Sequence, residues 1–596
     1  MVLHPATGAG KRARPGPGVN LRSVLDRLDV EKGSSQEGAS RSSTLRSLLL
    51  GLSLLALVAG IACWALDFGI VAMWLFVAAA VGVALVLPLP HAFVSPLYMS
   101  LFAWLVNMVP LALLAAWTAV SLRWALGLLK ERRLPRGGRW IWLPVALAAW
   151  TALGVLVVSS FDMKRFLLLF GIQVVSSATM LAVVDSMASL RDRMTIVWGL
   201  LGFVVLLSVA VLAQWVGINI QALQDTSVAA RAEAAYGLDA FPNNIGMIKY
   251  ARAQEGGAPA FRGKLEALAR ETPGLPAFEV FRPGFKAFDT DLVVRFDGSA
   301  REFEEQLAPL DIELIYDNVG LAPGAGVPRL RSFPRNALTY AGVSAALFPL
   351  GFFFAWRRRD RSRWFGVLAV ASCLFGAGFS LARGSWVAIL IGVIYLLVDG
   401  VMDRRAKMGA AAAFLAGALV LMGVFVFRYN SDPLNARAGA EGSVTTRQNV
   451  YTETVDSVVQ GIHIVLGYGT ERPRSDTGTS HVGTQYIPNA GTHSTYLNYA
   501  FRTGIPGALA VIVLYAIAIL HSRARSRRER DDEGLFSSLV TASVIIAAAH
   551  AVILSLYVEP IYTLTISLLL GIAMAGVGSF RGSLLPWKRP AAVDGS

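Results

Sequence analysis

The chain has 596 residues, of which 55% are hydrophobic and only 16% are charged, and its mean hydropathy is +0.53. A soluble domain carries about 25% charged residues, so this composition excludes an ordinary cytosolic enzyme and a disordered chain. The formal net charge is +14. In so apolar a chain, a basic excess is typical of cytoplasmic loops beside anionic lipid rather than of a nucleic-acid binder. The composition therefore predicts a polytopic membrane protein.

The polar leader and the two cysteines bear on processing and redox chemistry. The first apolar run begins only near residue 44, so no cleavable signal peptide is expected. Residues 1–43 are predicted to be a disordered cytoplasmic leader, with a surface-lying amphipathic helix over 19–30 as the alternative. Cys63 and Cys373 lie inside apolar runs, so no disulfide framework is expected.

Membrane-spanning helices are expected wherever about 20 mostly apolar residues follow one another. The predicted fold is all-α, a bundle of about 12–14 transmembrane helices. These helices fall into N-terminal (44–215), central (337–427) and C-terminal (495–580) groups, followed by a cytoplasmic tail at 581–596. The predicted runs are 44–66, 69–88, 96–122, 140–159, 165–187, 194–215, 337–356, 364–381, 384–402, 409–427, 495–520, 535–556 and 561–580.

Four connections are rich in Arg and Lys, and the positive-inside rule places them in the cytoplasm. They are 123–139, 357–363, 403–407 and 521–534. Counting helices outward from these anchors predicts that residues 216–336 and 428–494 form two large extracytoplasmic loops.

The N-terminal helices present a parity problem. Three runs precede residue 123, an odd number, yet both the basic leader and the basic connection 123–139 favour the cytoplasm. Either the stretch 90–122, which prolines interrupt, crosses the membrane twice, or one run is re-entrant.

The first large loop contains a segment with the pattern of strands and a short helix. It reads as a strand over 291–296, a helix over 300–308 and a strand over 311–316. This alternation predicts a small α/β insertion. Because long irregular loops in compact proteins are usually functional, both large loops are candidates for the site, and 428–494 is predicted to be the catalytic one.

Several candidate functional residues lie at predicted extracytoplasmic ends of helices. His493 lies where the second loop meets a helix; a water-satisfied polar residue is the alternative interpretation. Arg383 lies in a tight outer turn. Charges at membrane depth are costly and often mark a site, and guanidinium groups match phosphate oxygens bidentately. The remaining arginines of this set are Arg329, Arg331, Arg335 and Arg447. Their pattern favours capture of an anionic lipid headgroup, with anchoring to ordinary phospholipids as the alternative.

Four segments occur in the order typical of one family. HSTYLNYAFRTGIPG (493–507) resembles the "HN-x-YL…GIxG" signature of the O-antigen ligase and polymerase family. SLARGSW (380–386) resembles its "SRG-x-W" turn, TTRQNVYTETVDSVVQGIHIVLGYG (445–469) its "SR…W…PLxGxG" segment, and RLRSFPRNALTYAG (329–342) its "R-x-x-G-x-F-x-N-P-N" segment. The chain departs from the pattern at Tyr451, where Trp is common. Arg231 lies in a second partial copy of the arginine motif and is an alternative to Arg329 and Arg331.

The resemblance implies an inverting, metal-independent glycosyltransferase of the bacterial inner membrane. It would move a glycan from an undecaprenyl diphosphate carrier to an acceptor sugar hydroxyl on the periplasmic side, without a cofactor. It implies His493 as general base and a diphosphate site of Arg383, Arg447 and Arg329 or Arg331. Tyr496 and Asn498 would contact substrate. The expected partners are the lipid-linked donor, a lipid A–core or lipid-linked repeat acceptor, and membrane lipids, with no nucleic acid.

Three alternatives remain at this point. Asp289 and Asp291 have the spacing of a metal-using glycosyltransferase, although two acids so spaced before a strand are far more often part of a turn. A flippase for lipid-linked glycans, or a scaffold with an interaction module at 216–336, would also be polytopic. Within the family, the motifs do not separate a ligase from a polymerase.

Overall fold

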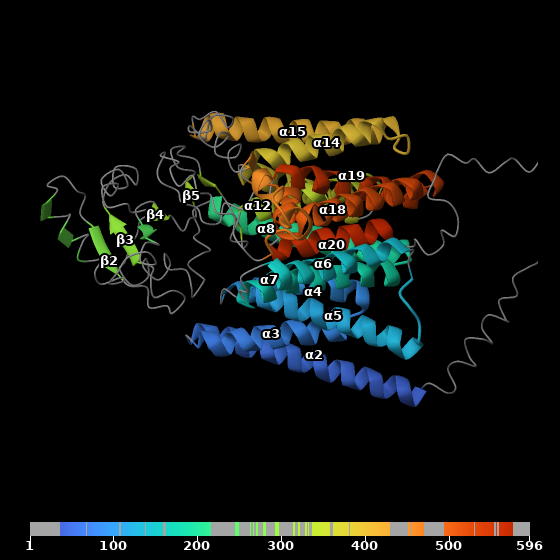
Figure 1. Ribbon diagram of the computed structural model, residues 1–596. Coiled ribbons are helices and arrows are strands. Elements are labelled where there is room, and N and C mark those ends of the chain that lie inside the picture. Colours follow the sequence, from blue (N-terminus) through green and yellow to red (C-terminus); the bar gives the residue numbers. More distant parts are fainter. Residues whose placement is uncertain are drawn as a thin grey trace, which may run out of the picture. The chain divides into compact units, whose positions relative to one another are not determined.

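The computed structural model shows an all-α polytopic membrane protein (Figure 1). Among the residues that the structure describes, eight helices are long and apolar enough to cross a membrane. Contacts divide the chain into two compact units, residues 1–52 and 53–596. The structure describes residues 36–66, 68–105, 109–136, 139–158, 163–215, 337–357, 361–380, 382–429, 451–452, 454–469, 494–529, 531–553, 556 and 559–575, with short stretches between 245 and 332.

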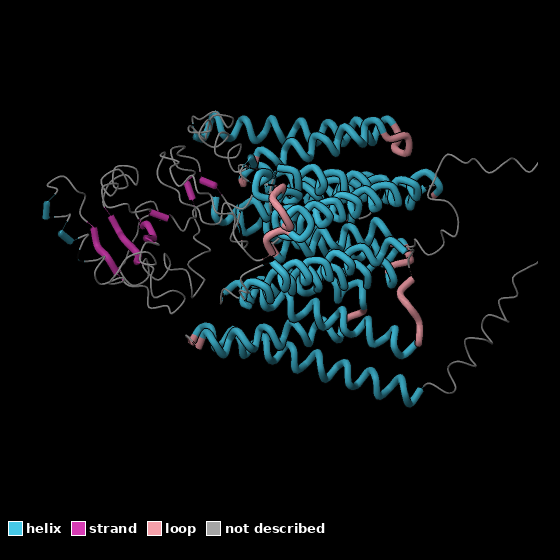
Figure 2. The backbone as a smooth tube through the Cα atoms, viewed as in Figure 1, coloured by secondary structure: helices cyan, strands magenta, loops and turns pink. Residues whose placement is uncertain are grey.

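Helices predominate among the described residues, as the tube in Figure 2 makes plain. Fourteen helices have at least 15 residues, the upper limit of the predicted number. The N-terminal group is α2 (Gln36–Ala65), α3 (Gly69–Val86), α4 (Leu89–Leu105), α5 (Val109–Glu131), α6 (Leu143–Val158), α7 (Met163–Ser186) and α8 (Leu190–Trp215). The central group is α12 (Ala337–Arg357), α13 (Ser362–Phe379), α14 (Arg383–Val398) and α15 (Arg404–Tyr429). The C-terminal group is α18 (Thr495–Arg528), α19 (Asp531–Ile553) and α20 (Pro560–Met574).

The N-terminal helices resolve the parity problem of the sequence. The predicted run 96–122 is two helices, α4 and α5, so four helices precede the basic connection after Glu131. Pro90 and Pro110 each occupy the second position of one of these helices, where the missing N–H breaks no intrahelical hydrogen bond. The prolines therefore start helices here, and an even number of crossings suits both basic segments.

One end of the bundle collects the basic connections, and we call it the basic end. There, hydrogen bonds and ion pairs of side chains connect the ends of different helices. These contacts join Arg123 to Leu87, Arg133 to Asp185, Arg193 to Glu533, Arg357 to Asp532 and Ser538 to Asp399. The opposite end, which we call the outer end, carries the turn between α13 and α14 and the start of α18.

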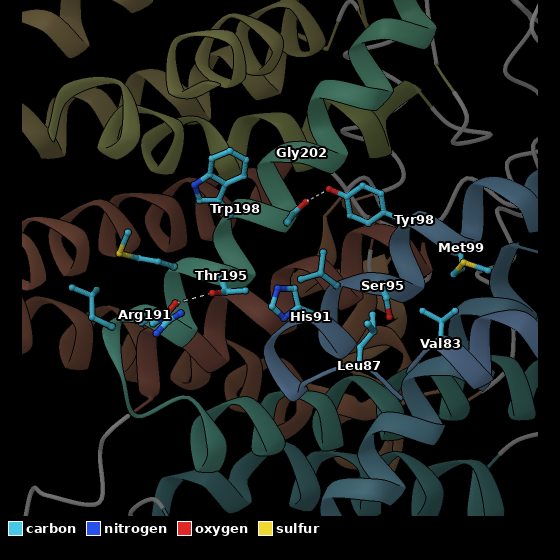
Figure 3. Close-up of a pocket in the computed structure, with 14 residues that line it drawn as sticks. Val83, Leu87, His91, Ser95, Tyr98, Met99, Arg191, Thr195, Trp198 and Gly202 are labelled. Carbon is cyan, nitrogen blue, oxygen red and sulfur yellow. Dashed lines mark hydrogen bonds between the residues drawn. The ribbon is translucent and has the colours of Figure 1, made fainter. Parts of the chain in front are cut away.

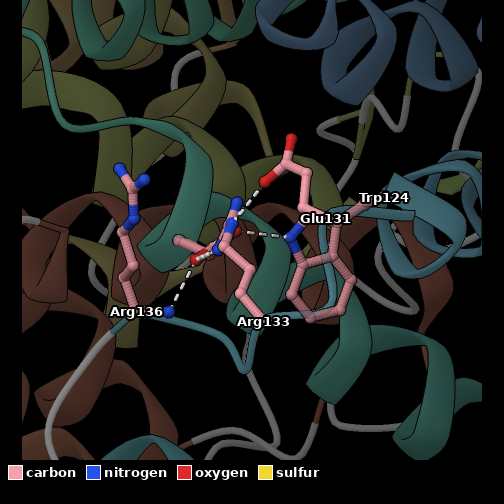
Figure 4. Close-up of polar contacts among 5 residues, drawn as sticks. Trp124, Glu131, Arg133 and Arg136 are labelled. Atoms are coloured by element: carbon pink, nitrogen blue, oxygen red, sulfur yellow. Dashed lines mark hydrogen bonds and ion pairs between the residues drawn. The ribbon is translucent and has the colours of Figure 1, made fainter. Parts of the chain in front are cut away.

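The contact between Arg133 and Asp185 is the most complete of these (Figure 4). The guanidinium donates two hydrogen bonds to the Asp185 carboxylate, at 2.7 and 3.0 Å. The same carboxylate accepts from Trp124 Nε1 at 2.9 Å and from the backbone N–H of Arg136 at 2.6 Å. The hydrogen bonds between the Arg133 guanidinium and the Asp185 carboxylate raise the pKa of Arg133, so the pair stays charged. The connection between α5 and α6 is thereby fixed to the end of α7.

The core of the bundle lies around α12, because 89% of the residues in its most apolar 18-residue stretch are buried. α12 packs against α13, α14, α19 and α20. Helices farther from this core expose large apolar side chains, such as Leu55, Trp74 and Leu419. Such exposure suits a surface solvated by lipid rather than by water.

The described strands lie in the first large loop. β1 (Ile245–Ile248), β2 (Phe278–Phe281), β3 (Leu292–Phe296) and β4 (Leu314–Ile315) form an antiparallel sheet in the order β2-β3-β1-β4. β5 (Gly320–Leu321) pairs with β6 (Pro328–Arg329). β3 and β4 fall within the two predicted strands. The predicted helix over 300–308 lies outside the described residues, so the α/β character of the insertion stays a prediction.

Candidate functional site

The structure describes only part of the predicted site. Arg383 is the first residue of α14 and is exposed, and Tyr496 and Asn498 lie in the first turn of α18. Arg329 belongs to β6, of which only the backbone is described. The remaining predicted residues lie outside the described part of the chain: His493, Arg331 and Arg447. Asp289, Asp291 and Arg231 also lie outside it.

α18 is two helices joined at a kink. Gly504 has a φ of +71°, a conformation that favours glycine, and the helix resumes at the following residues. Pro506 has no backbone N–H, so the carbonyl of Arg502 loses its normal helical partner. The non-helical Gly504 likewise breaks the helical pattern near the carbonyl of Phe501. The Gly-Ile-Pro-Gly sequence therefore exposes a pair of backbone acceptors inside an apolar bundle.

Residues 468 and 469 of the second large loop satisfy these acceptors. The backbone N–H of Tyr468 donates to the Phe501 carbonyl at 2.7 Å, and that of Gly469 donates to the Arg502 carbonyl at 3.0 Å. In return, Arg502 Nη1 donates to the Gly469 carbonyl at 3.4 Å. A Cβ on Gly504 would lie 2.2 Å from the Val465 carbonyl oxygen, so only glycine fits this approach. Two motifs that are separate in sequence thus form one joint, which we call the kink joint (residues 463–469 and 501–504).

Aromatic rings and α6 complete the kink joint. The rings of His463 and Tyr468 are stacked with centroids 3.7 Å apart, and Tyr468 stacks on Phe501 at 4.6 Å. The short helix α17 (His463–Leu466) brings this histidine to the stack. Trp150 of α6 donates from Nε1 to the Thr503 carbonyl at 3.0 Å. The joint is therefore anchored to the helical bundle rather than resting on the loop alone.

A second polar cluster lies near Arg383, two residues along α14. Ser385 Oγ lies 3.1 Å from His550 Nε2, and Tyr562 OH lies 3.3 Å from His550 Nδ1. His550 and Ser385 are fully buried, at 0% exposure. A Cβ on Gly342 of α12 would lie 2.7 Å from His550 Cε1. α12, α14, α19 and α20 therefore meet at one imidazole.

The first turn of α18 is fastened to the same part of α19. Tyr496 OH donates to the Ala548 carbonyl at 3.1 Å, two residues before His550. Ser494 is the N-cap of α18, and its hydroxyl accepts a hydrogen bond from the Leu497 N–H at 3.5 Å. Asn498 is buried beside them, at 2% exposure. The structure therefore brings the motif around Arg383 and the motif after residue 493 to one turn of α19, at Ala548 and His550.

His550 was not singled out from the sequence, although a signal was present. It is a histidine inside the apolar run 535–556, and ionisable residues within membrane helices commonly mark functional positions. Its partners Ser385 and Tyr562 are 165 and 12 residues away along the chain, so no local pattern could have identified them. Arg502 was also not predicted as a functional residue, because the motif that contains it was interpreted through its histidine and glycines.

Metal ligands do not gather in the described residues: no group of three or more His, Cys, Asp or Glu side chains is placed to hold an ion there. Among the described histidines, His463 contacts the Gly467 carbonyl through Nδ1 at 2.9 Å and stacks on Tyr468. Its contacts are those of a structural side chain.

Comparison with known families gives a match over the central part of the chain. Residues 368–512 match the family model described as O-Antigen ligase. Over this segment the chain is similar to that family. The matched segment runs from α13 through the kink of α18 and so contains Arg383, Ser385 and the kink joint. It ends before α19 and α20, which supply His550 and Tyr562. Among curated proteins, no match to the chain was found.

Proposed function

We propose that this protein transfers a glycan from an undecaprenyl diphosphate carrier to a sugar hydroxyl of an acceptor, at the periplasmic side of a bacterial inner membrane. The match to the O-antigen ligase family supports glycan transfer from a lipid-linked donor. The observation that carries the proposal further is the meeting of two ligase motifs at α19, through Ser385–His550 and Tyr496–Ala548. Substrate-binding residues must converge from distant segments, and these contacts bring their segments together.

In the proposed reaction, the acceptor hydroxyl oxygen attacks the anomeric carbon of the donor sugar. The bond between that carbon and the diphosphate oxygen breaks, and undecaprenyl diphosphate leaves. In-line attack inverts the configuration at the anomeric carbon. His493 takes the proton of the hydroxyl, because a neutral imidazole has a pKa near neutrality and suits a general base.

The leaving diphosphate needs compensation of its negative charge, and arginines supply it without a metal in this scheme. Arg383, Arg447 and Arg329 or Arg331 are assigned to this role. Guanidinium groups bind phosphate oxygens bidentately, and their effect is strongest where water is partly excluded. Ser385, two residues after Arg383 in the same helix, contacts His550 and so fixes the start of α14, which carries Arg383.

Tyr496 and Asn498 are assigned to positioning of the substrate. Tyr496 fixes the first turn of α18 to α19, and Ser494 caps that turn. This arrangement supports the assignment of His493, the neighbour of Ser494, as the base.

The assignment of the base can be tested in proteoliposomes that contain a glycan-linked undecaprenyl diphosphate donor. We expect His493→Ala to lower the transfer rate about 10²–10⁴-fold, the usual contribution of general-base catalysis. His521→Ala is the control, because His521 lies in α18 toward the basic end and contacts the Ile517 carbonyl. Transfer at the control rate by His493→Ala would remove His493 from the mechanism.

The acceptor distinguishes a ligase from a polymerase, and both follow the same chemistry. Deletion of the gene followed by gel analysis of surface glycans separates them. Loss of all long chains from a complete core, with lipid-linked polymer accumulating, identifies a ligase. Single repeats attached to the core identify a polymerase.

A further inference from the structure

A large cavity opens between α4 and α8, away from the kink joint and from Arg383 (Figure 3). Its volume is about 1010 Å³. Apolar side chains form most of its walls, namely Val83, Leu87, Val94, Met99, Met194 and Trp198. Pockets of this size and character hold ligands with a substantial hydrocarbon part.

The walls of this cavity are fixed by specific contacts. Tyr98 OH donates to the Gly199 carbonyl at 2.7 Å, and a Cβ on Gly202 would lie 2.5 Å from the same hydroxyl. Trp198 is stacked on Phe365 of α13, with ring centroids 3.7 Å apart and an interplanar angle of 3°. α4 and α8 therefore touch at glycines and diverge beside them, so the cavity is built into the fold.

The cavity mouth lies at the basic end and carries positive charge. His91, in the first turn of α4, and Arg191, in the first turn of α8, line it, and both are exposed. Arg123 adjoins the mouth, because its Nη1 donates to the carbonyl of the lining residue Leu87 at 2.6 Å. The lining contains no acidic side chain. Asp192 is the acid nearest in sequence, and it accepts a hydrogen bond from Ser189 at 2.7 Å.

We propose that this cavity binds one anionic phospholipid from the leaflet at the basic end. The hydrocarbon chain enters between α4 and α8, and the headgroup phosphate lies against Arg191 and His91. Charge complementarity selects the occupant, because an apolar cleft with a cationic rim matches a molecule with an anionic head and an apolar tail. Basic residues near the membrane surface attract anionic lipids in this way. This site is independent of glycan transfer.

Photo-crosslinking of the full-length protein in nanodiscs tests the proposal. The probe is phosphatidylglycerol with a diazirine in its acyl chain, and mass spectrometry locates the labelled residues. We expect labelling of peptides that contain residues 94–99 and 190–202. Unlabelled phosphatidylglycerol should compete, whereas phosphatidylcholine should not.

Variants separate a built site from general contact with lipid. Arg191→Gln should weaken competition by phosphatidylglycerol about fivefold, the effect expected for one basic side chain at an anionic surface. Arg405→Gln is the matched control, since Arg405 is an exposed arginine at the same end, at the start of α15. Thr195→Trp places a large ring in the cavity and should abolish labelling there while thermal unfolding stays cooperative.

Three outcomes would overturn the proposal. The first is equal competition by phosphatidylglycerol in Arg191→Gln and Arg405→Gln. The second is equal competition by phosphatidylcholine, which would make the cavity an unselective part of the lipid-facing surface. The third is competition by polyprenyl phosphate alone, which would assign the site to a lipid carrier. Transfer activity is not the readout, so none of these results depends on the proposed function.

Discussion

At the basic end of the bundle, charged side chains are paired with one another, whereas at the outer end, backbone carbonyls and neutral polar side chains make the contacts. Arg133 and Asp185 form a bidentate pair, and Arg193, which is 2% exposed, is paired with Glu533. At the outer end, the Phe501 and Arg502 carbonyls receive backbone N–H groups, and His550 contacts two hydroxyls. These paired charges of the basic end thus hold helices together.

This difference indicates a division between stability and function. Paired charges are poor ligands for a substrate, because binding would first require breaking the pair. At the outer end, the start of α14, where Arg383 lies, is instead held by the neutral polar contact between Ser385 and His550. Substitutions at the two ends should therefore affect different measurements.

The largest expected effect on stability comes from Asp185→Ala. Asp185 is fully buried and accepts four hydrogen bonds, from Arg133, Trp124 and Arg136. Removing one partner of a buried ion pair costs about 3–5 kcal/mol in the free energy of unfolding, and because the Arg133 side chain is 29% exposed, the loss here should lie at the lower end of that range. Thermal or denaturant unfolding in detergent measures this loss. Transfer per folded molecule should stay at the wild-type rate.

An exposed ion pair at the same end is the control for this prediction. Asp532→Ala removes the partner of Arg357, and both side chains of that pair are more than 40% exposed. Exposed pairs contribute about 0–1 kcal/mol. Equal destabilisation by both substitutions would contradict the view that burial makes the Asp185 pair important.

Gly504→Ala is expected to affect both stability and transfer. Its Cβ would lie 2.2 Å from the Val465 carbonyl, and a non-glycine residue at this positive φ is strained by about 1–3 kcal/mol. The kink joint must open to relieve the contact. We therefore expect transfer to fall about tenfold or more, because a displacement of about 1 Å near reacting groups is costly.

Gly127→Ala is the control for the kink joint. Nothing lies within 4 Å of a Cβ at Gly127, which is in the last part of helix α5. This change should leave transfer unchanged and stabilise the helix by at most about 1 kcal/mol. If Gly504→Ala behaved in the same way, the kink joint would have no role in positioning the site.

A double-mutant cycle sharpens the comparison at the outer end. Ser385→Ala and His550→Ala should be coupled by about 0.5–3 kcal/mol, the range for residues in direct contact. Equilibrium unfolding of the wild type, both single variants and the double variant gives the coupling energy. Additive effects would mean that the contact with His550 does not hold the start of α14.

The sequence predicted the helices better than their contacts. Apolar runs locate helices because every buried backbone group in a membrane must be satisfied within its own segment. The predicted helix boundaries differ from the observed ones where a proline was interpreted as the break of a helix but lies at its start, as Pro110 does in α5. α2 begins at Gln36, ahead of the first apolar residues, because polar residues can extend a helix beyond the membrane.

The candidate site was only partly predictable, because its contacts join residues far apart in the chain. The ligase motifs led to Arg383 and to Tyr496, and the structure places their segments on one turn of α19. They did not lead to His550 or to the docking of Tyr468 on Phe501. The docking has a local cause, since Gly504 and Pro506 leave carbonyls without helical partners, but the sequence does not say which N–H groups fill them.

The smallest expected effect is that of Tyr468→Phe, which removes one hydroxyl from the kink joint. Tyr468 OH donates to the Ser457 carbonyl at 3.1 Å, and a single hydrogen bond contributes about 0.5–1.5 kcal/mol. The ring and its stacking on His463 and Phe501 stay in place. Unfolding of Tyr468→Phe and Tyr468→Leu therefore separates the hydroxyl from the ring. If the kink joint depends on stacking, Tyr468→Leu loses more stability and transfer than Tyr468→Phe; equal losses would assign the role of Tyr468 to its hydroxyl.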